Sequence, residues 1–119
     1  MEAKSLDLSV LVEIFNGDSA GIPDLLEDVS QTVDRIEASL IETCKRQDWP
    51  GAGKALHELK GMCASSGCVE VAQLCAQTEA ILTAERYRQV PDCLESLRSA
   101  CGRLRSAIRE ACADQYQAR

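Results

Sequence analysis

One histidine stands out because small residues and a lysine surround it at helical spacing. His57 is the only histidine among the 119 residues, and Gly53 and Gly61 lie one helical turn before and after it. A glycine inside a helix costs about 1 kcal/mol relative to alanine, so two glycines flanking one side chain need a reason. We interpret them as clearance: without Cβ atoms at these positions, a bulky partner can approach the ring. Ala64 extends the same face.

A lysine follows the histidine by three positions. Residues three apart on a helix are neighbours, so the ammonium of Lys60 can reach a group attached to the imidazole. An accessible imidazole beside a cation suits the handling of an anion such as a phosphoryl group. The alternative is that this histidine is an ordinary surface or core residue without chemistry.

The apolar pattern predicts helices throughout and no strand. We expect helices over residues 6–15, from 19 or 22 to 46, over 50–65 and 69–86, and from about 89 to 113. The second helix carries an apolar seam at alternating steps of three and four, formed by Ile22, Leu26, Val29, Val33, Ile36, Leu40 and Cys44. Four long amphipathic helices with short connections predict an all-α, antiparallel up-down-up-down four-helix bundle, with a short additional N-terminal helix.

Length and charge narrow the class of protein. By length the chain is one domain, residues 1–119, and we expect loose ends at residues 1–5 and 114–119. A net charge of −6 argues against a nucleic-acid partner and fits poorly with anionic membrane surfaces. No apolar run approaches the ~20 residues of a membrane span. We expect a monomer, and Met1 with the whole-bundle length favours a free-standing protein.

Seven cysteines would suit a disulfide framework or a metal site, but their arrangement favours neither. Seven is an odd number, and the sequence has no signal peptide and no C-x-x-C pair. The cysteines fall at or near apolar positions, where an unpaired thiol behaves as a small hydrophobe. This predicts a reducing compartment, hence the cytoplasm. Cys63 lies off the face of His57. Zinc binding is disfavoured because the chain has one histidine and no paired thiol spacing, and a Cys–His nucleophile pair is disfavoured because nothing orients the base.

The segment around the histidine resembles a known family. His57-Glu58-Leu59-Lys60-Gly61, followed by Ala64 and Gly67, resembles the H-x-L-K-G-x-x-A-x-x-G signature of histidine-containing phosphotransfer (HPt) domains. Other family-like pieces occur in order along the chain: Phe15-Asn16-Gly17-Asp18, Gln47-Asp48-Trp49 and Leu74-Cys75-Ala76-Gln77-Thr78-Glu79. Together the matches span about residues 6–85. Thr78 is a departure, since the family usually has leucine there.

The resemblance implies a phosphorelay intermediate. In this family the histidine, here His57, accepts a phosphoryl group from the aspartyl phosphate of a receiver domain in a hybrid sensor kinase. It then passes the group to the aspartate of a response-regulator receiver. The resemblance gives Lys60 as the electrostatic neighbour of the phosphoryl group, and Gly61, with Gly53 and Ala64, as the open approach. Such a chain is a phosphocarrier and not an enzyme in its own right.

The next helix offers two candidates for orienting the ring. Gln77 and Glu79 can hydrogen-bond the other nitrogen of His57 and fix its tautomer; alternatively, both are solvated polar residues. No cofactor of the chain's own is expected, since the receiver supplies Mg²⁺. Gly51-Ala52-Gly53-Lys54 is only a fragment of a nucleotide-binding loop.

Two other interpretations stay open. A histidine-kinase dimerisation helix has H-E-L-R-x-P, and His57-Glu58-Leu59-Lys60 matches its start, but Met62 stands in place of the proline and no ATP-binding domain follows. A non-catalytic helical interaction module with an idle histidine would bind a partner without chemistry. Autophosphorylation with ATP would favour the first alternative. Phosphoryl transfer that does not depend on His57 would favour neither the histidine-kinase interpretation nor the phosphorelay.

Overall fold

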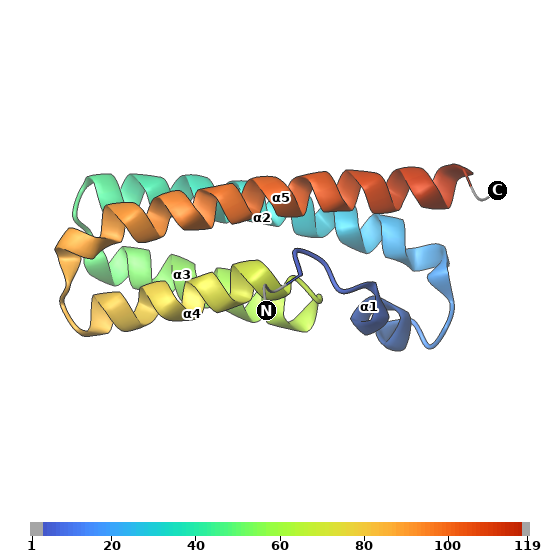
Figure 1. Ribbon diagram of the computed structural model, residues 1–119, viewed down its shortest axis with the longest axis horizontal. Coiled ribbons are helices and arrows are strands. Elements are labelled where there is room, and N and C mark those ends of the chain that lie inside the picture. Colours follow the sequence, from blue (N-terminus) through green and yellow to red (C-terminus); the bar gives the residue numbers. More distant parts are fainter. Residues whose placement is uncertain (1–3, 118–119) are drawn as a thin grey trace.

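Four long helices form an antiparallel bundle, and a short helix lies beside it (Figure 1). The computed structural model describes residues 4–117, without the side chains of residues 19 and 114–117. The bundle helices are α2 (Ile22–Lys45), α3 (Trp49–Ser65), α4 (Val69–Thr83) and α5 (Val90–Gln117). The shorter elements are α1 (Leu8–Ile14) and the 3-10 turns η1 (Ser19–Gly21) and η2 (Tyr87–Gln89). The described residues contain no strand, and the predicted all-α bundle is confirmed.

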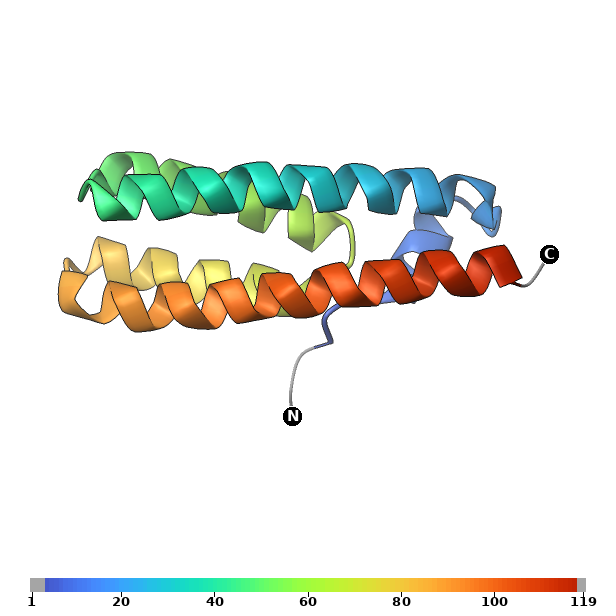
Figure 2. The ribbon, with the colours of Figure 1, turned by 90° about the horizontal axis from the view of Figure 1, so that it is seen from above.

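Each bundle helix packs against two neighbours, in the cyclic order α2, α3, α4, α5. Helices α2 and α5 form one face, which Figure 2 shows from above, and α3 and α4 form the opposite face. The predicted seam of α2 is buried, because its members from Ile22 to Leu40 are at most 4% exposed. Leu97, Cys101, Leu104 and Ile108 of α5 close the core from the other side. Among the described helices, none is both long and apolar enough to cross a membrane.

The N-terminal end of α3 is fixed by capping. The Asp48 carboxylate accepts a hydrogen bond from the backbone N–H of Gly51 at 3.0 Å. Pro50 lies in the first turn, where its missing N–H leaves no helical bond unmade. The helix therefore begins at Trp49, one residue before the predicted start.

The C-terminal end of α3 is fixed by a tight turn into α4. Gly67 adopts φ +78°, and the Cys68 N–H donates to the Cys63 carbonyl at 2.8 Å. The same turn anchors the N-terminal segment, because the Gly67 carbonyl accepts the Asp7 N–H at 2.7 Å. A glycine is needed here for two reasons: its positive φ, and the Asp7 carbonyl, which would lie 2.6 Å from a Cβ atom.

The N-terminal segment departs from the prediction. Residues 1–3 of the expected loose start lie outside the described residues, but residues 4 and 5 are bonded to the start of α4. The Lys4 carbonyl accepts the Glu70 N–H at 2.9 Å, and Ser5 Oγ donates to the Glu70 carboxylate at 3.3 Å. In α1 only Leu11 is buried, whereas Ile14 is 52% exposed. Helix α1 is only about two turns long, and it contacts the core along one side only.

Two helix ends differ from their predicted positions. Helix α4 ends at Thr83 instead of residue 86, because Glu85 adopts φ +56°, a left-handed conformation that ends a helix, and η2 follows. Helix α5 continues to Gln117, whereas the sequence predicts a loose C-terminal end from residue 114 onward. Residues 118–119 of that predicted loose end lie outside the described residues.

We predict that Gly67→Ala destabilises the fold by about 1–3 kcal/mol, because alanine must adopt a left-handed conformation against the Asp7 carbonyl. Gly102→Ala is the matched control: it lies within α5, and its Cβ would meet open space. That substitution should stabilise the helix by about 0.5–1 kcal/mol. Urea unfolding of both variants measures the difference, and equal free energies of unfolding would contradict the role given to Gly67.

Candidate functional site

The imidazole of His57 stands in solvent on the outer side of α3. Its side chain is 78% exposed. A Cβ atom at either Gly53 or Gly61 would meet open space, and Ala64 is itself exposed. The face predicted from helical spacing is therefore open in the structure, and a partner can reach the ring from outside the bundle.

A carboxylate from α4 lies between the histidine and the lysine. Glu79 Oε2 is 3.8 Å from His57 Nδ1, and Glu79 Oε1 is 2.9 Å from Lys60 Nζ. The longer distance exceeds that of a hydrogen bond, so this contact is one between charge and ring and not a hydrogen bond. Oε1 is buried and forms no hydrogen bond with any described residue, so the close approach of Lys60 is an ion pair without hydrogen-bond alignment. The lysine thus offsets the desolvation of this carboxylate.

The turn between α3 and α4 sets the register of this cluster. In an antiparallel pair, residues equally distant from the turn lie side by side. His57 precedes Gly67 by ten residues and Glu79 follows it by twelve, which brings the two to nearly the same level. Lys60 lies one turn closer on the same side of α3 and reaches the same carboxylate.

The two candidates on α4 separate in the structure. Glu79 reaches the site, but Gln77 does not: its side chain is exposed and makes no recorded contact with His57 or Lys60. The physical reason is helical geometry, since residues two positions apart point about 200° away from each other. Thr78, between them, is buried and donates its hydroxyl to the Leu74 carbonyl at 2.7 Å, so this departure from the family pattern leaves no unpaired polar group.

One contact beside the site has no signal in the sequence. The Glu58 carboxylate pairs with Arg35 of α2 at 3.2 Å. Both side chains remain largely exposed, so the pair adds little stability. The pair does hold one positive and one negative charge in place on the side of α3 that faces away from Glu79. The partners are 23 positions apart in the sequence, so no local pattern predicts this pair.

Four of the seven thiols lie in the core. Cys63, Cys68, Cys75 and Cys101 are fully buried. Burial raises the pKa of Cys75 to about 12, with the nearby Glu79 carboxylate adding to the effect, and burial likewise raises the pKa of Cys101 to about 12. In the part of the chain that the structure describes, no three His, Cys, Asp or Glu side chains gather as metal ligands would.

Comparisons with known proteins place this geometry in context. A family model described as the Hpt domain matches residues 22–114, which is most of the chain. No curated protein matches. The crystal structure of histidine-containing phosphotransfer protein B from Pseudomonas aeruginosa PAO1 superposes with a TM-score of 0.85. The match covers 95% of this chain and 98% of that chain at 19% sequence identity, so it demonstrates a shared fold.

The buried thiols predict how stability depends on pH. The pKa of Cys75 and of Cys101 rises from 9.0 to about 12 on burial, so the unfolded chain releases protons at a pH where the folded chain still holds them. The free energy of unfolding should therefore be at its full value below pH 9 and fall as the pH rises from 9 towards 12. Urea unfolding across this window measures the fall. In a Cys75→Ala, Cys101→Ala variant the free energy of unfolding should fall less over this pH range. An equal fall in the variant and in wild type would show that the two thiols are not its cause.

Proposed function

The chain belongs to the family of Hpt domains, and we propose that it relays a phosphoryl group through His57. The donor is the aspartyl phosphate of a receiver domain in a hybrid sensor kinase, and the acceptor is the aspartate of a response-regulator receiver. The observation that carries the proposal is the imidazole itself, which is 78% exposed on a face lined by small residues. A buried or screened ring would have no route to a receiver's aspartate.

The proposed step is a transfer between an oxygen and a nitrogen. An unprotonated Nε2 has a lone pair that attacks the phosphorus atom; the N–P bond forms as the O–P bond breaks, and the receiver's carboxylate leaves. The return step runs the same bonds in reverse with the next receiver. Positioning by the docked partner contributes most to such a transfer.

Glu79 and Lys60 are proposed to support that step. A carboxylate beside Nδ1 favours the tautomer with hydrogen on Nδ1, which leaves Nε2 free to attack. Lys60 is the electrostatic neighbour of the phosphoryl group, and its ammonium shifts from Glu79 towards the new charge once His57 is phosphorylated. Gly61, Gly53 and Ala64 keep the approach open, as inferred from their spacing.

The partner is proposed to supply the rest of the chemistry. The receiver holds the Mg²⁺ that neutralises charge on the phosphoryl group, and the chain acts as a phosphocarrier with no nucleotide site of its own. We propose a monomer in the cytoplasm that forms transient, modest interfaces with receivers and engages neither nucleic acid nor membrane. A non-catalytic interaction module and a histidine-kinase dimerisation domain are the competing functions.

Phosphotransfer from a phosphorylated receiver tests the proposal directly. Wild type should acquire label from a receiver that carries ³²P on its aspartate, and His57→Gln should acquire none, since glutamine has no nucleophilic ring nitrogen. A panel of receiver domains identifies donor and acceptor. Transfer to His57→Gln at the wild-type rate would overturn the assignment, and labelling by ATP without any kinase would favour the dimerisation domain.

Substitutions at Gly61 test the clearance argument. Gly61→Leu should fold normally, because its Cβ meets open space, yet slow transfer by about a hundredfold by displacing the receiver from the ring. Gly61→Ala is the matched control, expected to transfer near the wild-type rate and to gain about 0.5–1 kcal/mol of stability. Thermal unfolding checks the fold of each variant. Full transfer by a folded Gly61→Leu variant would show that clearance is not needed.

A further inference from the structure

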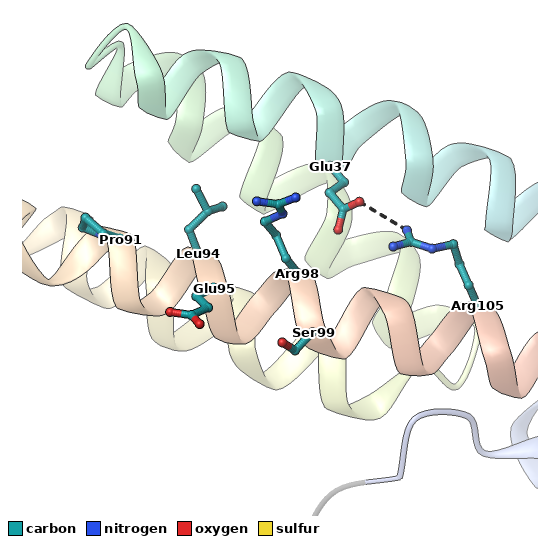
Figure 3. Close-up of a pocket in the computed structure, with 7 residues that line it drawn as sticks. All are labelled: Glu37, Pro91, Leu94, Glu95, Arg98, Ser99 and Arg105. Carbon is teal, nitrogen blue, oxygen red and sulfur yellow. Dashed lines mark hydrogen bonds and ion pairs between the residues drawn. The ribbon is translucent and has the colours of Figure 1, made fainter.

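A groove lies between α2 and α5. These two helices form the face of the bundle opposite α3 and α4, which carry His57 and Glu79. Two hollows of about 610 and 510 Å³ adjoin there and share Pro91 and Leu94 in their walls. Figure 3 shows the first hollow, with the Leu94 and Arg98 side chains of α5 reaching towards α2. The groove follows α5 from Pro91 to Arg105, and these 14 steps (105 − 91) span about 21 Å at 1.5 Å per residue.

The hollow at the end of the bundle has apolar and aromatic walls. Ile41, Val90 and Leu94 line it together with the rings of Trp49 and Tyr87. The two rings stack with centroids 4.7 Å apart and planes 4° from parallel, so each ring holds the other in place in this wall. Such a hollow suits a large apolar or aromatic side chain of a partner.

Positive charge borders the groove although the chain is acidic overall. Lys45 and Arg88 line the end hollow, and Arg98 lines the other. Among the described residues, none of these three cations has an ion pair or hydrogen-bond partner. Arg105 differs, because two carboxylates of α2 hold it at 3.0 and 3.3 Å. Two acids also line the wall: Glu95, and Glu37, whose Oε1 pairs with Arg105 while its Oε2 is buried without a hydrogen bond to any described residue. The three unpartnered cations outnumber these two acids.

We propose that this groove binds an acidic, extended segment of a partner protein. One large apolar or aromatic side chain of the segment enters the hollow beside Trp49, and its carboxylates pair with Lys45, Arg88 and Arg98. The length favours a peptide over a compact small molecule, since about 21 Å corresponds to about six residues of extended chain. Burial of the apolar anchor provides most of the affinity. The cations orient the bound segment and raise its association rate.

The position of the groove has a consequence for the relay. Because it lies on the opposite face of the bundle, a segment bound there leaves His57 accessible to a receiver. The groove can therefore hold a partner while phosphotransfer proceeds on the other face. The inference does not depend on the role of the histidine, since it rests on the α2–α5 face alone.

Selection from a phage-displayed random peptide library on the immobilised full chain tests the proposal. Selected peptides should be rich in Asp and Glu around a large apolar or aromatic residue. Their affinity should fall about tenfold or more in a Lys45→Glu, Arg88→Glu variant and should weaken with added salt. Lys54→Glu, a lysine substitution on α3 away from the groove, should leave the affinity unchanged. Binding to His57→Gln should also match wild type, which separates this surface from the relay.

Several results would overturn the proposal. These are the absence of any enriched peptide, a basic or neutral consensus, and equal affinity for wild type and the charge-reversed variant. Laurate, an apolar anion, tests the small-molecule alternative: if it binds the groove while no acidic peptide does, the occupant is not a peptide. If the charge-reversed chain fails to fold, Lys45→Gln with Arg88→Gln carries the same test with a smaller expected loss.

Discussion

The register between α3 and α4 is the constraint on which the site depends. A glycine with positive φ lets the chain turn within three residues, so that α4 returns along α3 with little slack. This register brings the Glu79 carboxylate to the level of both His57 and Lys60. A shift of one residue would rotate Glu79 by about 100° and leave the imidazole without a neighbour on α4. The N-terminal segment stabilises this turn from outside, because the Asp7 N–H donates a hydrogen bond to the Gly67 carbonyl.

The sequence predicted those features that depend on periodicity and local chemistry. The seam of α2 follows from the spacing of its apolar residues, and it is buried in the structure. The open face around His57 follows in the same way, because positions four apart on a helix share a side wherever the helix packs.

Contacts between residues far apart in the chain could not be predicted from the sequence. Gln77 and Glu79 flank the buried Thr78 on opposite sides. Choosing between them required knowing which side of α4 faces α3, and periodicity alone does not give that. The pairing of Arg35 with Glu58 and the bonds from residues 4 and 5 to Glu70 join segments far apart in the chain. The exposure of Ile14 reflects how little of α1 touches the bundle, a property of docking that an amphipathic pattern does not encode.

The bundle presents two faces of different character. The α3–α4 face offers a reactive ring among small residues, which suits brief contact with a receiver. The α2–α5 face offers an apolar hollow with unpartnered cations, which suits longer retention of an acidic segment. Under the proposed relay, separating retention from chemistry would let each surface act without blocking the other.

The central claim is that the charge of Glu79 sets the tautomer of His57 and so frees Nε2 for attack. Nitrogen-15 NMR of the labelled imidazole, recorded where the ring is neutral, measures the tautomer directly. The account predicts hydrogen on Nδ1 in wild type and a shift of the population towards hydrogen on Nε2 in Glu79→Gln. A wild-type ring with hydrogen mainly on Nε2, or a tautomer ratio that Glu79→Gln leaves unchanged, would contradict it.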